Sequence, residues 1–251
     1  VLVLLPMGIL QLVHKQPKTV PFVLAAILLL GIGARVYWVV MVPTAQVSDF
    51  GRFHIWALQL ANREPNIAID RYDNFTRLLS LLYRVWPSAV AVEVLNILLG
   101  TATAASLYFL ARLHGQEKAG LVAAFWMALY PPHISMTAIV NTDIPSVFLL
   151  VLSVLLLSRY LRDKNILFLV LSGASFALCF FLRGAMVIYF PVLAAGLLLE
   201  KQKLRTRLLS GGLLLAAVLV SAAGFNTAIG RVQAPGLTID ESRYLIWPLV
   251  N

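Results

Sequence analysis

Long apolar runs alternate with short polar stretches along most of this chain. Seven of the runs are candidates for membrane-crossing helices, because an α-helix rises about 1.5 Å per residue and the hydrocarbon core of a bilayer is about 30 Å thick. They cover residues 20–42, 89–113, 119–130, 139–161, 166–182, 185–199 and 208–229. The pattern predicts an all-α, multi-pass membrane protein with about seven transmembrane helices, in which residues 20–229 form one transmembrane domain.

A polar segment over residues 43–88 separates the first apolar run from the second. Pro43 ends the preceding helix, because proline cannot continue the backbone hydrogen-bond ladder, and Ser48 or Asp49 is a good N-cap for the next one. From Asp49 onward, polar and apolar side chains recur at steps of three and four, which predicts an amphipathic helix that could lie along a membrane surface. A second short amphipathic helix is expected over residues 74–86.

The two ends of the chain are less regular. Residues 1–13 are apolar but would form a helix of only about 20 Å, which is too short to cross a bilayer. Residues 1–19 are therefore expected to form an apolar segment followed by a basic loop. Residues 230–251 are expected to form a tail on the same side of the membrane as residues 43–88. The chain starts without a methionine, and we expect it to be truncated.

The composition agrees with a membrane location. Hydrophobic residues make up 60% of the chain, charged residues 12%, and the mean hydropathy is +0.86, whereas a soluble domain carries about a quarter charged residues. The net charge of +9 could indicate a nucleic-acid ligand. The basic residues, however, lie in short clusters between apolar runs, so membrane topology explains them and no nucleic-acid partner is expected. The single cysteine, Cys179, excludes an intrachain disulfide.

The loops predict how the chain is oriented. One side carries eleven basic and three acidic residues: Lys15, Lys18, Arg112, Lys118, Arg159, Arg162, Lys164, Lys201, Lys203, Arg205 and Arg207, against Glu117, Asp163 and Glu200. Short loops rich in lysine and arginine stay in the cytoplasm. The chain is therefore expected in the cell (inner, cytoplasmic) membrane, with its N-terminal loop inside and the Asp49 loop on the outer side.

Polar groups gather on the outer face in this topology. They are Asp49, Arg52, His54, Asp70, Asp73, Glu93, His133, Asn141, Thr142, Asp143 and Arg183. Ionisable groups in or beside membrane spans are costly and are usually functional. The sequence lacks metal-type spacings of cysteine and histidine, a glycine-rich phosphate loop and a serine nucleophile elbow. Any chemistry is therefore expected from these outer residues.

Most of these residues also have a structural interpretation. Asp49 and Asp143 could cap helix N-termini, where an anion is favourable. Glu93 could form an ion pair with Arg35 or Arg84. Arg183 could be an interface anchor. The histidines, His54 and His133, could be hydrogen-bonded structural groups, and Asp70 and Asp73 could be turn residues.

The order of these features resembles the GT-C type membrane glycosyltransferases, specifically the protein O-mannosyltransferase and aminoarabinose-transferase-like group. The resemblance covers about residues 30–195. Its elements are Ser48-Asp49 in the first outer loop, Val94 to Gly100 in the second span, Ala128 to His133 at the end of the third, Thr142-Asp143 at the start of the fourth and Arg183 after the fifth. This chain departs from the group where Phe50 follows Asp49, since many relatives carry an acid pair there.

The resemblance implies a function on the outer face. The donor would be a sugar on a polyprenyl phosphate, Asp49 the catalytic base, and Arg183 the best candidate to bind the donor phosphate. Direct attack by the acceptor would invert the sugar carbon, and Asp143 would help to place the acceptor or a cation. No cofactor is certain; a divalent cation, Mg²⁺ or Mn²⁺, could be shared by Asp49 and Asp143. Further residues that could bind substrate are Arg52, His54, Glu93, His133 and Asn141.

Two other functions fit the pattern. The chain could be a non-catalytic subunit of a membrane protein complex that kept a transferase-like fold, since fold alone does not decide activity. It could also be a transporter of lipids or solutes. Transporters place broken helices and charges near the bilayer midplane, often in inverted repeats. Here the charges lie at one face and the sequence shows no repeat, which favours the transferase.

Overall fold

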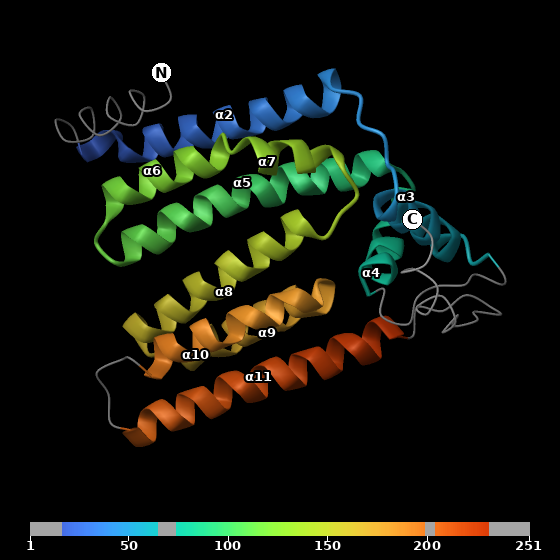
Figure 1. Cartoon of the computed structure of the whole chain (residues 1–251). Helices are drawn as coiled ribbons and strands as arrows, with labels where there is room; N and C mark the ends of the chain where they lie inside the picture. Colours follow the sequence, from blue (N-terminus) through green and yellow to red (C-terminus); the bar gives the residue numbers. More distant parts are fainter. Residues whose placement is uncertain (1–16, 65–73, 199–203, 231–251) are drawn as a thin grey trace, which may run out of the picture.

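The computed structural model describes residues 17–64, 74–198 and 204–230, and over these ranges the chain is helical and contains no β-strand (Figure 1). The elements are η1 (Pro17–Thr19), α2 (Val20–Met41), α3 (Asp49–Ala61), α4 (Asn74–Tyr83), α5 (Ala89–Leu113), α6 (Glu117–Ala128), α7 (Pro131–Ser135), η2 (Met136–Ala138), α8 (Asp143–Asp163), α9 (Ile166–Leu182), η3 (Gly184–Tyr189), α10 (Phe190–Leu198) and α11 (Leu204–Gly230). The expectations for residues 1–16, for Asp70 and Asp73, and for the tail over 231–251 lie outside the described residues.

The all-α membrane architecture is confirmed, whereas the number of spans is supported only in part. Helices lie in all seven predicted regions, but within the part of the chain that the structure describes only α2, α5, α8 and α11 are long and apolar enough to cross a membrane. α9 has 17 residues and α6 has 12, and the sixth region divides into the 3₁₀-helix η3 and α10. The described residues thus support four spans, and seven stays a prediction.

The chain runs back and forth, so its connections gather at two ends of the bundle (Figure 1). The first end, which we call the site end, holds α3, α4, η2 and η3, and α7 leads into it from beside the middle of α5. The second end, which we call the basic end, holds the α5–α6 and α8–α9 connections and the starts of α2 and α11. Eight basic and two acidic described residues lie there: Lys18, Arg112, Lys118, Arg159, Arg162, Lys164, Arg205 and Arg207, with Glu117 and Asp163.

Both predicted amphipathic helices form, and they pack against each other at the site end. The apolar stripe of α3 meets α4, where the Phe53 and Phe75 rings lie edge to face with centroids 5.3 Å apart. Ala57 and Leu60 on this stripe are fully buried. Much of the apolar surface that could have faced lipid is thus covered by protein.

A buried arginine joins the first half of the bundle. Arg35 of α2 is completely buried, and its guanidinium donates to the main-chain oxygens of Gly31 at 3.0 Å, Ala128 at 2.9 Å and Met127 at 3.3 Å. The last two belong to the C-terminal turn of α6, whose partial negative charge favours a cation. Gly100 of α5 makes room for it, because a Cβ there would lie 2.6 Å from the Arg35 Nε.

Gly100→Ala is expected to destabilise the protein, although alanine is normally favoured over glycine in a helix by about 1 kcal/mol. The new methyl group would meet Arg35, which is buried and held by its hydrogen bonds. Such overpacking costs about 1–3 kcal/mol, so the midpoint of thermal unfolding should fall by several degrees. Gly33→Ala is the matched control, because a Cβ added at Gly33 would meet no atom within 4 Å. An unfolding midpoint for Gly100→Ala at or above that of Gly33→Ala would contradict this account.

The charge difference between the two ends predicts that the basic end faces the cytoplasm. In a Cys179→Ser background, a cysteine at Ala45 should react with a membrane-impermeant maleimide in intact cells. A cysteine at Gln116 should react only after the membrane is opened. Both positions are exposed in their connections, whereas Cys179 is fully buried. The opposite labelling pattern would reverse the orientation.

Candidate functional site

A shared apolar core brings the predicted site elements together at the site end. This cluster contains Ala57 of α3, Tyr83 of α4, Val92 of α5, Val140 and Leu182 of α9. Val140 lies just before Asn141 and Asp143, and Leu182 lies just before Arg183. Burial of these apolar groups therefore fixes where the neighbouring polar residues emerge.

Asp49 is the first residue of α3, and Ser48 occupies the N-cap position with φ of 54° but makes no side-chain capping bond. The carboxylate of Asp49 lies 2.9 Å from the guanidinium of Arg52, one turn further on, and both side chains are about half exposed. Arg52 also lies over the Trp56 ring, 5.1 Å from its centroid. Asp49 is thus an accessible anion with one cationic neighbour rather than an N-cap.

The segment before Asp49 is tied to the segment before Asp143 by one side chain. The Gln46 amide donates to the Ala138 carbonyl at 2.8 Å and accepts from the Val140 amide at 2.9 Å. Asn96 of α5 supports the same strip of backbone, donating to the Thr137 and Ile139 carbonyls. These bonds hold the two connections side by side at the site end.

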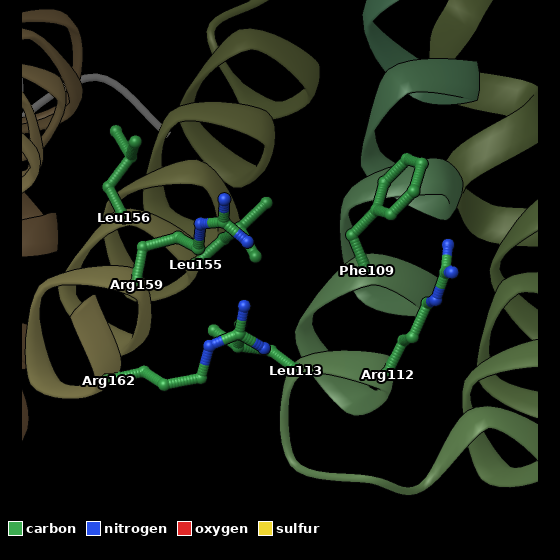
Figure 2. A pocket seen from close by; sticks show the side chains of 7 residues that line it. All are labelled: Phe109, Arg112, Leu113, Leu155, Leu156, Arg159 and Arg162. Atoms are coloured by element: carbon green, nitrogen blue, oxygen red, sulfur yellow. The ribbon is translucent and has the colours of Figure 1, made fainter.

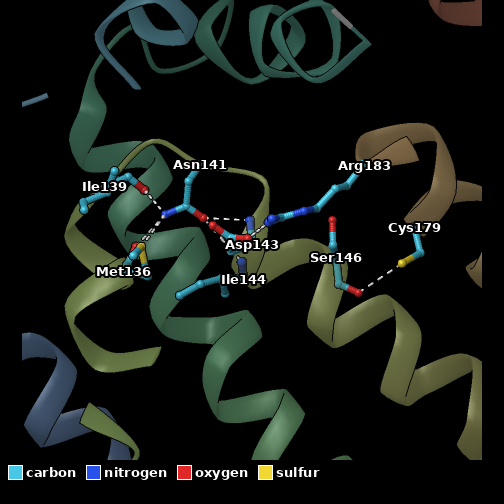
Figure 3. Close-up of polar contacts among 8 residues, drawn as sticks. All are labelled: Met136, Ile139, Asn141, Asp143, Ile144, Ser146, Cys179 and Arg183. Atoms are coloured by element: carbon cyan, nitrogen blue, oxygen red, sulfur yellow. Dashed lines mark hydrogen bonds and ion pairs between the residues drawn. The ribbon is translucent and has the colours of Figure 1, made fainter. Parts of the chain in front are cut away.

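Asn141 shapes the start of α8 (Figure 3). Its buried side chain accepts from the backbone amides of Asp143 at 2.8 Å and Ile144 at 3.4 Å and donates to the carbonyls of Met136 and Ile139. Asn141 therefore caps the N-terminus of α8. Capping was the structural role that the sequence suggested for Asp143. The Asp143 carboxylate is left to point toward other groups.

Asp143 and Arg183 form an ion pair between the start of α8 and the end of α9 (Figure 3). Each side chain is about 40% exposed. The pairing follows from the close packing of the two helices, where the buried Cys179 thiol donates to the Ser146 carbonyl at 3.2 Å. A surface ion pair of this kind adds little stability, so its main effect is to orient both groups.

The buried Tyr83 contacts His54 and lies within reach of the charge of Glu93. The His54 Nδ1 and the Tyr83 hydroxyl lie 2.7 Å apart. Burial lowers the pKa of His54. Burial, with the Glu93 carboxylate as a second cause, raises the pKa of Tyr83. The hydroxyl therefore keeps its proton and can donate it to a neutral imidazole. Among the described residues, Glu93 forms no ion pair with Arg35 or Arg84.

His133 of α7 is buried, with its Nδ1 3.2 Å from an Arg35 amino group. Since arginine can only donate, Nδ1 must be the acceptor and the imidazole is neutral. Burial lowers the pKa of His133 to about 4, with the charge of Arg35 as a second, smaller cause. This contact supports the structural interpretation of His133, and a role in substrate binding stays a prediction.

The sequence profile of one family, described as dolichyl-phosphate-mannose-protein mannosyltransferase, matches residues 75–224, more than half of the chain. The chain belongs to the dolichyl-phosphate-mannose-protein mannosyltransferase family. The GT-C resemblance is therefore confirmed, and the chain is a membrane glycosyltransferase of the kind that uses a polyprenyl-phosphate sugar donor. No individual curated protein gives a significant match.

The match to the mannosyltransferase family covers only part of the site. Glu93, His133, Asn141, Asp143 and Arg183 lie within the matched residues, whereas α2 and the start of α3, with Asp49, Arg52 and His54, lie before them. The matched region thus contains the Asp143–Arg183 half of the site, and the roles of these two residues stay predictions. The assignment of Asp49 rests on its position at the site end.

Two contacts that build the site have no separate signal in the sequence. Gln46 and Tyr83 lie within ordinary polar and amphipathic patterns, and their partners are 92 and 29 residues away.

A metal site is not evident: the described residues contain no group of three or more histidine, cysteine, aspartate or glutamate side chains placed to hold an ion. The cation that Asp49 and Asp143 could share stays a prediction.

Proposed function

We propose that this chain transfers a sugar from a polyprenyl phosphate to an acceptor at the site end, with Asp49 as the base and Arg183 at the donor phosphate. The observation that carries the proposal is the half-exposed Asp143–Arg183 pair, which lies at the same end of the bundle as Asp49. A solvent-accessible arginine at the end of an apolar helix suits a phosphate on a lipid chain.

The proposed reaction is a direct displacement. The acceptor hydroxyl or amine attacks the anomeric carbon while the bond from that carbon to the phosphate oxygen breaks. The bonding electrons leave with the polyprenyl phosphate, and the acceptor proton passes to the Asp49 carboxylate. Attack opposite the leaving group inverts the sugar carbon. A positioned base of this kind contributes about 10²–10⁴-fold in rate.

Arg183 would stabilise the charge that grows on the departing phosphate. Asp143 accepts from the same guanidinium and would keep it aimed across the site while still leaving N–H groups for a phosphate, because a guanidinium has more donors than one carboxylate uses. Asp143 is therefore proposed as the residue that positions Arg183. Placement of the acceptor or of a cation by Asp143 is a further role that stays a prediction.

The orientation follows from the charges of the loops. With the basic end in the cytoplasm, the site end lies on the outer side of the cell membrane, where donor and acceptor would meet. A partner in a membrane protein complex fits the same location.

The role of Arg183 predicts a specific pattern of donor binding. Arg183→Ala should weaken binding of a polyprenyl-phosphate sugar by at least about tenfold, since a charged hydrogen-bond partner is lost. Arg183→Lys should restore only part of the affinity, because lysine lacks the bidentate fork. Binding to the purified protein can be measured with a fluorescent short-chain donor.

Asp143→Asn is the matched control for this measurement. It removes the same ion pair while leaving the arginine in place, and Asn141 still caps the start of α8. The donor should bind to Asp143→Asn less tightly than to the parent but clearly more tightly than to Arg183→Ala, because the arginine is still present but is no longer held in place. Equal losses in Asp143→Asn and Arg183→Ala would show that the arginine acts only through the ion pair.

The role of Asp49 predicts a separation of activity from stability. Asp49→Asn keeps the size of the side chain but removes the base, so sugar transfer should fall by at least about a hundredfold. Its ion pair with Arg52 is exposed, and such pairs are worth about 0–1 kcal/mol, so the thermal unfolding midpoint should stay near that of the parent. Both quantities are measured on the same preparation.

Glu64→Gln provides the comparison, since it makes the same chemical change at the far end of α3 and should leave transfer unchanged. Transfer by Asp49→Asn at the parental rate would rule out Asp49 as the base. A parent protein that folds but transfers no sugar from any polyprenyl-phosphate donor would favour the non-catalytic subunit instead.

A further inference from the structure

The basic end of the bundle contains a pocket between α5 and α8, at the far side of the protein from the proposed transfer site (Figures 1 and 2). Its volume is about 550 Å³. Three arginines and four apolar side chains line it: Arg112, Arg159 and Arg162, with Phe109, Leu113, Leu155 and Leu156. Figure 2 shows Arg159 and Arg162 extending from α8 toward α5.

Apolar and basic groups follow a fixed order in this pocket. On α8, Leu155 and Leu156 come about one helical turn before Arg159, and on α5, Phe109 comes one turn before Arg112. Both helices are candidate membrane spans that end here. Phe109, Leu155 and Leu156 therefore lie deeper in the bundle than the arginines, whereas Leu113, the last residue of α5, lies beside them. Phe109 is 45% exposed.

The three arginines have acidic neighbours, but these carboxylates leave some of the arginine N–H groups unused. Arg159 and Arg162 share one carboxylate, Asp163, at 3.2 and 3.0 Å, and Arg112 lies 3.4 Å from Glu117. In each pair the closest contact is made by Nε, and a guanidinium carries further N–H groups on its two terminal nitrogens. All three side chains are 42–58% exposed, so these groups can reach a ligand.

We propose that this pocket binds the phosphate headgroup of an anionic membrane phospholipid, with the glycerol and upper acyl chain against Phe109, Leu155 and Leu156. The order of the lining fits a ligand with an apolar body and an anionic head, which a free phosphate or a nucleotide lacks. Basic pockets between membrane helices at the cytoplasmic side are suited to such headgroups. The site is independent of the proposed transfer reaction.

Native mass spectrometry of the purified chain in detergent tests the proposal. The probes are phosphatidylglycerol and phosphatidylcholine with identical acyl chains. The parent should bind phosphatidylglycerol at least about tenfold more tightly. Arg159→Gln/Arg162→Gln should lose at least about tenfold of that affinity, since each basic residue near such a headgroup contributes about fivefold. Lys18→Gln/Arg205→Gln removes two charges at the same end but outside the pocket and should change binding by less than about twofold.

A second variant separates the pocket from general surface charge. Leu155→Trp enlarges a side chain that points toward α5 (Figure 2) without changing any charge, so it should also weaken binding of phosphatidylglycerol. It also keeps the test valid should the double arginine variant fail to fold. Equal binding of the two lipids by the parent would overturn the proposal. So would loss of affinity in the Lys18/Arg205 control equal to that in the pocket variant, or binding of inorganic phosphate without a preference between the lipids.

Discussion

The arrangement at the site end depends on the burial of the Arg35 guanidinium inside the helix bundle. A charge taken out of water needs compensation, and among the described residues Arg35 has no carboxylate partner. Main-chain oxygens at the end of α6 and the neutral His133 of α7 provide it instead. This requirement fixes where α6 must end and where α7 must lie. α7 then leads into η2 and the segment that carries Asn141 and Asp143, so the position of the site follows from one buried cation.

Hydropathy predicted the ends of the helices well where charged or turn-forming residues flank an apolar run, and less well elsewhere. α9 occupies the predicted residues 166–182, and α5 the predicted 89–113. The fourth predicted span begins four residues late, because η2 and the hydrogen bonds of Asn141 occupy the preceding segment. Apolar composition alone cannot reveal such a break, since it is set by side-chain hydrogen bonds rather than by hydrophobicity.

The candidate site was predictable as a list of residues but not as a set of contacts. Position along the chain places Asp143 and Arg183 at one end of the bundle, yet their pairing depends on how α8 and α9 pack. Likewise, nothing in the sequence near His133 indicates that Arg35, 98 residues away, is its neighbour. Long-range packing decides these contacts, and a single sequence carries no direct record of it.

The two bonds of Gln46 have a consequence for how this protein tolerates insertions and deletions. A side-chain amide that donates and accepts at once imitates one rung of a β-ladder, and here it anchors the chain only three residues before Asp49. The short spacer between Gln46 and Asp49 sets the distance between the anchored amide and the carboxylate, because an extended residue adds up to about 3.5 Å. Adding or removing one residue there would displace the Asp49 carboxylate by about that distance relative to the Asp143 segment. Length in this spacer is thus as constrained as residue type.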